Sequence, residues 1–236
     1  MRFETEERAV TSAEGRRREI LAAAVRVIGA GGPDAITHRR VAAEAGVGLG
    51  SLTYYFESRD DLVREAFRYY LQRSSELLIA LETEIPPGSA DDLVELIIEM
   101  TRREFMEPAM LRAEYEMILY AARDEVVSRE FVAWERGLEA RLGAILEALG
   151  APRPIAAART IIELVRGFEL ERLARPSDPI DDLRYRLSVV IGALVGKRQP
   201  AVASMSAAQI QIPKFARPRR GSREISRRTE PRRTNR

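Results

Sequence analysis

Residues 37–56, THRRVAAEAGVGLGSLTYYF, have the pattern of a short helix, a glycine turn, a second short helix and an aromatic exit. Thr37 is a favourable N-cap because its hydroxyl can accept a hydrogen bond from a free first-turn N–H. Ile36 and Val41 have the spacing of a hydrophobic staple, and Gly46 supplies the left-handed residue that ends the first helix. An ordinary helical hairpin would explain an isolated Ala-Gly-Val signal. The full arrangement instead predicts a helix-turn-helix, whose second helix enters a DNA groove.

The second helix is expected to divide its side chains between a small core and an outer face. Val47 and Leu52 should point to the core. The outer face should carry Gly48, Leu49, Ser51 and Thr53. Leu49 can contact a thymine methyl, and Ser51 can pair with several bases. Because the segment offers few side chains that form paired hydrogen bonds to bases, we expect a reader that relies more on DNA shape and phosphate contacts.

Residues 15–75 resemble the N-terminal DNA-binding domain of TetR-family transcriptional regulators. The family pattern is an amphipathic helix, then G-x-x-x-x-T, A-x-x-A-G-V, L-Y-x-H/Y-F, and a Ser/Asn-Lys/Arg start to a long fourth helix. It occurs here as residues 17–30, Gly32 to Thr37, residues 42–47, residues 52–56 and Ser58-Arg59. Two positions depart from it. Thr53 replaces the usual Tyr, and Gly48 replaces the usual Ser or Thr cap, although glycine is still a tolerable N-cap.

The resemblance implies an all-α fold in which a three-helix helix-turn-helix domain is joined by a long helix to a larger helical ligand-binding and dimerisation domain. We expect a flexible N-terminal arm at residues 1–14 and the DNA-binding domain at residues 15–75. An effector-binding and dimerisation domain should follow at residues 76–199, and a basic disordered tail at residues 200–236. Helical periodicity predicts helices at 17–30, 58–84, 91–106, 109–123, 126–149, 155–174 and 181–197.

The implied function is sequence-specific transcriptional regulation, with a repressor released from its operator by a small-molecule effector. The implied partners are double-stranded DNA with a palindromic operator, a second copy of the chain and an unidentified small molecule. Arg39 and Arg40 oppose the helix dipole, which a phosphate or groove contact would offset. Tyrosine hydroxyls can donate to phosphates, and Arg59 aligns with a phosphate-binding Lys of the family. The candidate DNA contacts are Thr37, Arg39, Arg40, Gly48, Leu49, Ser51, Tyr54, Tyr55 and Arg59.

The larger domain gives weaker signals. An apolar effector pocket is expected, with Phe105, Met110, Tyr115, Tyr120, Trp134 and Phe168 as candidate lining residues, although such residues at helical spacing are more often core. The family dimerises through its last two helices. The matching apolar residues are Ile161, Val165, Phe168, Leu187, Val190, Ile191 and Leu194. Burial within one subunit is an alternative that does not exclude dimerisation.

Composition narrows the remaining possibilities. The 236 residues are 45% hydrophobic, without a run long enough for a membrane helix, so we expect a globular cytoplasmic protein with no membrane partner. The chain has no cysteine and one histidine, which argues against disulfides and Cys- or His-rich metal sites, and no cofactor is expected. Residues 214–236 hold ten basic and two acidic residues, a net +8, so the rest of the chain carries −6. Any DNA footprint on the globular part must therefore be local.

Two other classes of function, a helical enzyme and a protein-interaction scaffold, are alternatives. Asp91, Asp92 and Glu95 in an all-α chain resemble the Mg²⁺-diphosphate carboxylates of isoprenoid synthases. However, acids are favoured at a helix start in any case, and no second carboxylate cluster is evident. A helical protein-interaction scaffold is the other alternative, and residues 37–56 argue against it. We expect a regulator and not an enzyme.

Overall fold

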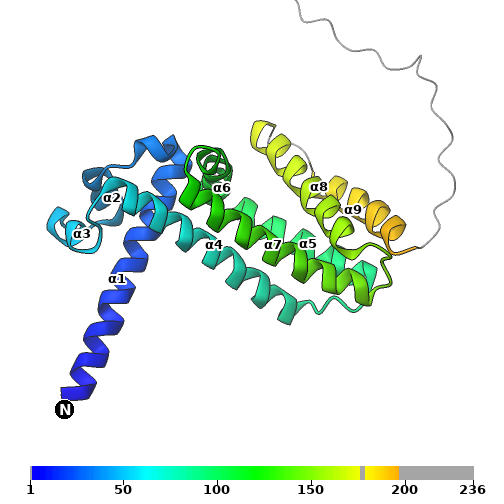
Figure 1. The fold of residues 1–236 in the computed structure, drawn as a ribbon, viewed down its shortest axis with the longest axis horizontal. Coiled ribbons are helices and arrows are strands. Elements are labelled where there is room, and N and C mark those ends of the chain that lie inside the picture. Colours follow the sequence, from blue (N-terminus) through cyan, green and yellow to red (C-terminus); the bar gives the residue numbers. More distant parts are fainter. Residues whose placement is uncertain (1, 176–178, 197–236) are drawn as a thin grey trace, which may run out of the picture. The chain divides into compact units, whose positions relative to one another are not determined.

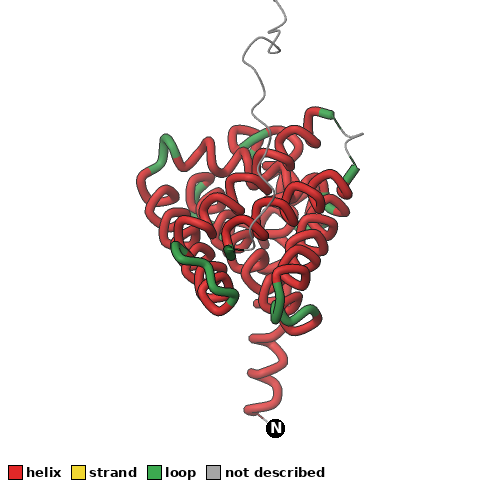
Figure 2. Tube along the Cα trace, turned by 90° about the vertical axis from the view of Figure 1, so that its right-hand side faces the viewer, coloured by secondary structure: helices red, strands yellow, loops and turns green. Residues whose placement is uncertain are grey.

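The computed structural model describes residues 2–175 and 179–196, with side chains from residue 13 onward. Every regular element in this part of the chain is a helix (Figure 1). Figure 2 shows the same residues as helices joined by short loops, with no strand among them. The elements are α1 (Arg2–Gly31), η1 (Pro33–Ala35), α2 (His38–Ala45), α3 (Leu49–Tyr55), α4 (Arg59–Glu84), α5 (Ala90–Met106), α6 (Pro108–Ala121), α7 (Glu125–Ala148), α8 (Pro154–Ala174) and α9 (Ile180–Leu194). The predicted all-α fold is confirmed.

The first helix starts earlier than the sequence pattern indicated. We expected a helix over 17–30 after an arm at 1–14, but α1 already begins at Arg2. Residues 2–16 contain no proline and a single glycine, Gly15, and are rich in Glu, Arg and Ala. Those three residue types favour a helix, so no stop signal separates the arm from the helix. Residues 2–14 are an extension of α1.

One hydrophobic core holds the N-terminal helices together. It joins α1, α2 and α3 to the first half of α4, and it also includes one face of α6. Ile36, Val41, Leu52 and Phe56 are completely buried in it. This burial matches the predicted staple and the predicted inward direction of Leu52. The DNA-binding part of the molecule is therefore packed directly on α6.

A second core lies between the later helices. It is built from α5, the end of α7, α8, α9 and the last turns of α4. Tyr70 of α4 belongs to the first core, while Leu81 of the same helix is completely buried in the second. The long helix α4 therefore runs through both cores. The predicted domain boundary after residue 75 falls between these two residues and remains a prediction.

Helices α1 and α6 approach each other closely at Gly29. A Cβ added there would lie 1.8 Å from the backbone oxygen of Ala109 on α6. Beside this contact, Arg112 Nε donates to Gly29 O at 2.8 Å. The absence of a side chain at Gly29 lets α1 and α6 pack backbone to backbone.

The remaining helices begin and end close to the predicted residues. Side-chain caps explain the agreement at three starts, where Ser58, Ser89 and Asp124 accept hydrogen bonds from first-turn N–H groups. None of the described helices is long and apolar enough to cross a membrane. The predicted basic tail at 200–236 lies outside the described residues.

Candidate nucleic-acid interface and internal cavity

The turn between α2 and α3 has the predicted caps. Thr37 Oγ1 accepts from Arg40 N at 3.1 Å and so caps α2. Gly46 ends α2 in the left-handed conformation, with φ 66°, and its N–H donates to the last-turn carbonyls. Gly48 is the N-cap of α3 without a side-chain hydrogen bond. The geometry is that of a helix-turn-helix with α3 as the exposed second helix.

The outer face of α3 carries few free polar groups. Leu49 is 49% exposed and Tyr54 is 82% exposed. Thr53 is also exposed, but its hydroxyl donates to Leu49 O at 3.2 Å and to Gly50 O at 3.1 Å. Ser51 is half-buried. The surface that α3 presents is therefore mostly apolar and aromatic.

The two tyrosines at the end of α3 have different environments. Their rings meet edge to face, with centroids 5.2 Å apart. Tyr55 is half-buried and packs against the first core, whereas Tyr54 points away from it. Of the two predicted phosphate donors, Tyr54 is the more accessible.

The predicted arginine contacts also fall into two groups. Arg39 and Arg40 are exposed, and their side chains form no hydrogen bond or ion pair within the described part of the chain. The Arg59 side chain, in contrast, is already engaged. Its Nη2 donates to Pro33 O at 2.8 Å and to Asp34 at 3.0 Å.

Two further bonds complete the environment of Arg59. Its Nε donates to Ile36 O at 3.2 Å, and its Nη1 donates to Asp60 at 3.0 Å. A guanidinium has five N–H donors, so one of them remains for a phosphate. Arg59 thus connects the start of α4 to the η1–α2 connection, and Asp34 and Asp60 offset its charge.

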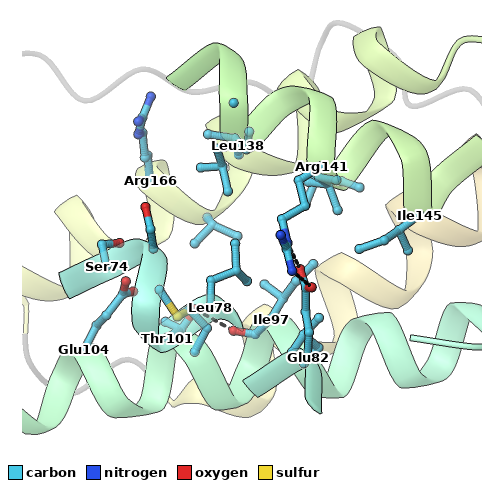
Figure 3. A pocket seen from close by; sticks show the side chains of 18 of the residues that line it. Ser74, Leu78, Glu82, Ile97, Thr101, Glu104, Leu138, Arg141, Ile145 and Arg166 are labelled. Atoms are coloured by element: carbon cyan, nitrogen blue, oxygen red, sulfur yellow. Dashed lines mark hydrogen bonds and ion pairs between the residues drawn. The ribbon is translucent and has the colours of Figure 1, made fainter. Parts of the chain in front are cut away.

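A cavity of about 370 Å³ lies among α4, α5, α7 and α8, with one residue from α6 (Figure 3). Its wall is mainly apolar. It is formed by leucine, isoleucine, methionine and valine side chains of these helices, among them Leu78, Leu93, Ile97, Met100, Leu138 and Val165. Trp134 lines the same wall, and its Nε1 donates to Ser75 Oγ at 3.0 Å. The volume is within the range of small-molecule pockets.

Two ion pairs lie at the polar edges of this cavity. Figure 3 shows Glu82 paired with Arg141, whose Nε–Oε1 distance is 2.6 Å. Arg166 pairs with Glu135 on α7 and also lies over the ring of Phe131, with 5.5 Å from Cζ to the ring centroid. The charges of both lining arginines are therefore already offset by carboxylates.

Three other carboxyl groups line the cavity without such a partner. Glu114 and Glu169 are 7% and 3% exposed, and Glu104 is partly buried beside them. No ion pair joins any of the three to a residue that the structure describes. Neutral tyrosines are hydrogen-bond donors to two of them: Tyr70 donates to Glu114, and Tyr115 donates to Glu169 at 2.7 Å.

Burial and mutual repulsion raise the pKa values of this cluster. Burial raises the pKa of Glu169 to about 7, with the charge of Glu114 as a further cause. The pKa of Glu104 is also held well above its usual value by burial and by the charges of Glu169 and Glu114. Both shifts favour the protonated form of these two carboxyl groups. Burial raises the pKa of Glu114, while the Tyr70 hydrogen bond and the charge of Arg166 oppose that rise. The charge of Arg166 also opposes the rise in the pKa of Glu169.

The residues predicted to line a pocket are mostly elsewhere. Trp134 lines the cavity, and Tyr115 reaches its edge through Glu169. Phe105 and Phe168 pack against each other in the second core, at 6.1 Å between ring centroids. Met110 and Tyr120 pack against the first core. None of the three carboxyl groups was among the residues predicted to line the pocket. For Glu169 the sequence does contain a signal, because an acidic residue occupies the apolar face of a helix. Glu169 follows Ile161 and Val165 at four-residue spacing.

The residues predicted for a dimer interface mostly belong to the subunit's own core. Four of them are 2% exposed or less: Ile161, Phe168, Leu187 and Ile191. Val165 lines the cavity, while Val190 and Leu194 pack partly buried against the second core. The exposed faces of α8 and α9 instead carry Leu170 and Tyr185, which are 50% and 70% exposed.

The acidic residues considered for an enzyme have structural partners. Ser89 caps α5, and its hydroxyl donates to Asp92 at 2.7 Å. Glu95 forms an ion pair with Arg184 of α9. Among the described residues, no group of His, Cys, Asp or Glu side chains has the geometry to hold a metal ion.

Family models match both parts of the chain. The model for bacterial regulatory proteins of the tetR family matches residues 20–66. A model described as tetracyclin repressor-like, C-terminal domain, matches residues 88–196. Together the two matches cover more than half of the chain.

Individual relatives agree with these matches. The nicotine-responsive transcriptional repressor HdnoR of Paenarthrobacter nicotinovorans is 26% identical over 70% of this chain and 87% of its own. A TetR-family structure from Streptomyces coelicolor A3 is 29% identical, with a TM-score of 0.58 over 74% of this chain and 97% of its own. The multidrug binding protein EbrR, in complex with proflavin, is 29% identical, with a TM-score of 0.53 over 76% of this chain and 99% of its own. The chain belongs to the TetR family, whose members are DNA-binding transcriptional regulators with ligand-binding C-terminal domains and are not enzymes.

Proposed function

We propose that the protein is a homodimeric repressor that inserts α3 of each subunit into the major groove of one half of a palindromic operator. The observation that carries this proposal is the exposed α3 beyond the Gly46 turn, with the unpaired Arg39 and Arg40 at the start of α2. Half-sites about 34–36 Å apart, or a multiple of that distance, fit such a dimer.

The exposed chemistry of α3 favours limited direct base readout. Leu49 is suited to a thymine methyl, and Ser51 is the remaining polar candidate. The Thr53 hydroxyl is occupied by backbone carbonyls, and Gly48 and Gly50 have no side chain to offer. Sequence preference should therefore depend strongly on the shape and deformability of the operator.

Phosphate contacts are best assigned to the free groups. Arg39, Arg40 and Tyr54 are exposed, and Thr37 lies at the same helix start. Tyr55 and Arg59 are weaker candidates than the sequence suggested, because Tyr55 packs inward and Arg59 holds η1 and α4 together. Arg59 should act mainly by fixing the position of the helix-turn-helix.

The exposed faces of α8 and α9 are the proposed dimer contact. The two helices lie side by side (Figure 1) and present Leu170 and Tyr185 to solvent. Gly167 and Gly192 have open space at their missing Cβ positions, which would let a partner helix approach closely. The buried residues Ile161, Phe168, Leu187 and Ile191 would pack beneath this face.

The cavity among α4, α5, α7 and α8 is the proposed effector site. HdnoR is named for its response to nicotine and EbrR for multidrug binding, and both names support a small-molecule ligand here. Tyr70 connects the cavity to the long helix that begins in the DNA-binding part, because it lies on α4 and donates to Glu114 of the cavity wall. A ligand that changes the environment of Glu114 would shift α4 and spread the two α3 helices.

DNA retention from a genomic fragment pool tests the proposal, followed by titration against the selected and a scrambled duplex at two salt concentrations. Arg39→Ala/Arg40→Ala should weaken binding to both duplexes and lower the salt dependence by about two phosphates' worth. Leu49→Ala should act mainly on the selected duplex. Arg123→Ala, which removes an exposed arginine from the end of α6, is the matched control. Retention of no specific fragment, or a monomer by sedimentation, would refute the proposal.

A further inference from the structure

The charges around the cavity do not balance. Four carboxyl groups line it, on Glu82, Glu104, Glu114 and Glu169, together with two arginines. Arg141 pairs with Glu82, and Arg166 pairs with Glu135, which is not part of the lining. Counting Glu135, five carboxyl groups therefore accompany two guanidinium groups, and no ion pair in the described part of the chain reaches Glu104, Glu114 or Glu169. The charge of Arg166 lowers the pKa values of Glu114 and Glu169 only in part, because both remain raised.

Burying carboxyl groups in this way is costly for the empty protein. A buried carboxylate without a counter-charge is unfavourable, and such groups take up protons instead. Burial raises the pKa values of both Glu104 and Glu169. Glu114 accepts a hydrogen bond from Tyr70 at Oε2. The residue is only 7% exposed and lines the cavity.

The shape of the site indicates what would balance it. The three carboxyl groups belong to α5, α6 and α8 and do not form a geometry that could hold a metal ion. The rest of the lining is mainly apolar and includes Trp134, a residue type whose ring face attracts cations. The complement of such a site is a positive group on an apolar body, not a bare ion and not an anion.

We propose that the cavity binds an organic cation, with the positive group held by Glu104, Glu114 and Glu169 and the apolar body held against Trp134 and the aliphatic wall. The proposal rests on the assignment of the cavity as the effector site and adds the chemical class of the effector. Binding would displace the protons from the cluster and place the cation next to the Glu114–Tyr70 contact.

The single tryptophan of the chain gives a direct readout. Trp134 is the only one among the 236 residues and lines the cavity, so quenching of its fluorescence reports occupancy without any DNA. Two isosteric probes separate charge from shape: 1-methylquinolinium, which is permanently cationic, and 1-methylnaphthalene, which is neutral. Because the two differ in hydration, the decisive quantity is how each affinity changes when the carboxyl groups are replaced.

Glutamine is the appropriate replacement because it keeps the size and the neutral hydrogen bonding of a protonated carboxyl group. In a single variant the remaining groups would ionise more readily and compensate in part. The main variant is therefore Glu104→Gln/Glu169→Gln, and Glu114→Gln is a second. Glu163→Gln is the matched control, an exposed glutamate on α8 outside the cavity.

The double variant should bind 1-methylquinolinium at least about tenfold more weakly, because close buried charge pairs contribute at least about 1.5 kcal/mol. Its affinity for 1-methylnaphthalene should stay within about threefold, and Glu163→Gln should change neither value. Absence of saturable binding of the cation, or an equal loss for both probes, would overturn the proposal. If the double variant does not fold, the same two probe affinities are measured on Glu114→Gln, which should also lose affinity for 1-methylquinolinium and not for 1-methylnaphthalene.

Release of operator DNA is measured separately. Cation binding that depends on the three glutamates but does not release DNA would uphold the ligand class and count against the proposed regulatory function. Specific DNA binding together with charge-independent ligand binding would uphold the regulator and overturn the ligand class. The two proposals can therefore fail independently.

Discussion

Replacing Gly29 with alanine is a direct test of the backbone contact between α1 and α6. The new Cβ would lie 1.8 Å from Ala109 O and 2.8 Å from the carbonyl carbon behind it. Neither atom is the flexible end of a side chain, so the helices themselves must move apart. The shift would also stretch the bond from Arg112 Nε to Gly29 O, now 2.8 Å.

Two opposing terms set the expected magnitude. Alanine in a helix interior is favoured over glycine by about 1 kcal/mol. Overpacking a core typically costs about 1–3 kcal/mol of stability. Because the added Cβ of Gly29→Ala would clash with backbone atoms, we expect a cost at the upper end of this range, about 3 kcal/mol or more. The net loss in the free energy of unfolding should be about 2 kcal/mol. For a chain of this size that corresponds to a melting temperature about 4–8 °C lower.

Gly15→Ala is the matched control on the same helix. Nothing lies within 4 Å of its missing Cβ, so the helix preference acts alone and should raise the melting temperature slightly. Both variants are compared with the parent by far-ultraviolet circular dichroism at one protein concentration, because a dimer's melting temperature depends on concentration. A Gly29→Ala protein that melts with or above the parent would refute the close approach of α1 and α6.

Three further predictions concern single side chains. Tyr70→Phe removes the donor to Glu114 and should cost about 1–3 kcal/mol in urea unfolding, because a buried acceptor loses its partner. Glu169 has its pKa raised from 4.5 to about 7, chiefly by burial, so it takes up protons on folding, and its contribution to stability falls as the pH rises through that interval. Glu169→Gln should flatten this fall in unfolding free energy, and an unchanged pH profile would contradict the raised pKa. Leu170→Asp should dissociate the dimer in sedimentation, whereas Leu119→Asp, 61% exposed on α6, should not.

The fold was largely predictable because its signals are local. Thr37, Gly46 and Ser58 act within a few residues of their own position, and each cap occurs where the sequence placed it. The early start of α1 was missed because no residue between 2 and 16 forbids a helix and the apolar stripe begins later. The lack of a helix-breaking residue is weaker evidence for a continuous helix than a capping residue is for a helix end.

The candidate sites were less predictable because they depend on contacts between distant residues. Arg59 matched a family position for phosphate binding, but its carbonyl partners at Pro33 and Ile36 come from the fold. Glu104 and Glu114 look like ordinary surface acids in the sequence. They become a site only where α5 and α6 bring them to the same cavity.

Glu114 lies where a change in the cavity can reach the DNA-binding helices. It accepts from Tyr70 of α4, and its own helix, α6, carries Arg112 and Ala109 against α1 at Gly29. In the empty protein, buried carboxyl groups raise the free energy of the cavity. A cation that neutralises them lowers it, so the empty and loaded states differ more in energy than they would around a neutral cavity. A ligand shifts a conformational equilibrium only by its difference in affinity for the two states. Charge in the cavity enlarges that difference where the two conformations hold Glu114 differently around the cation, as a shift of Tyr70 and α4 would cause. By linkage, operator DNA must then weaken cation binding by the same factor by which the cation weakens DNA binding.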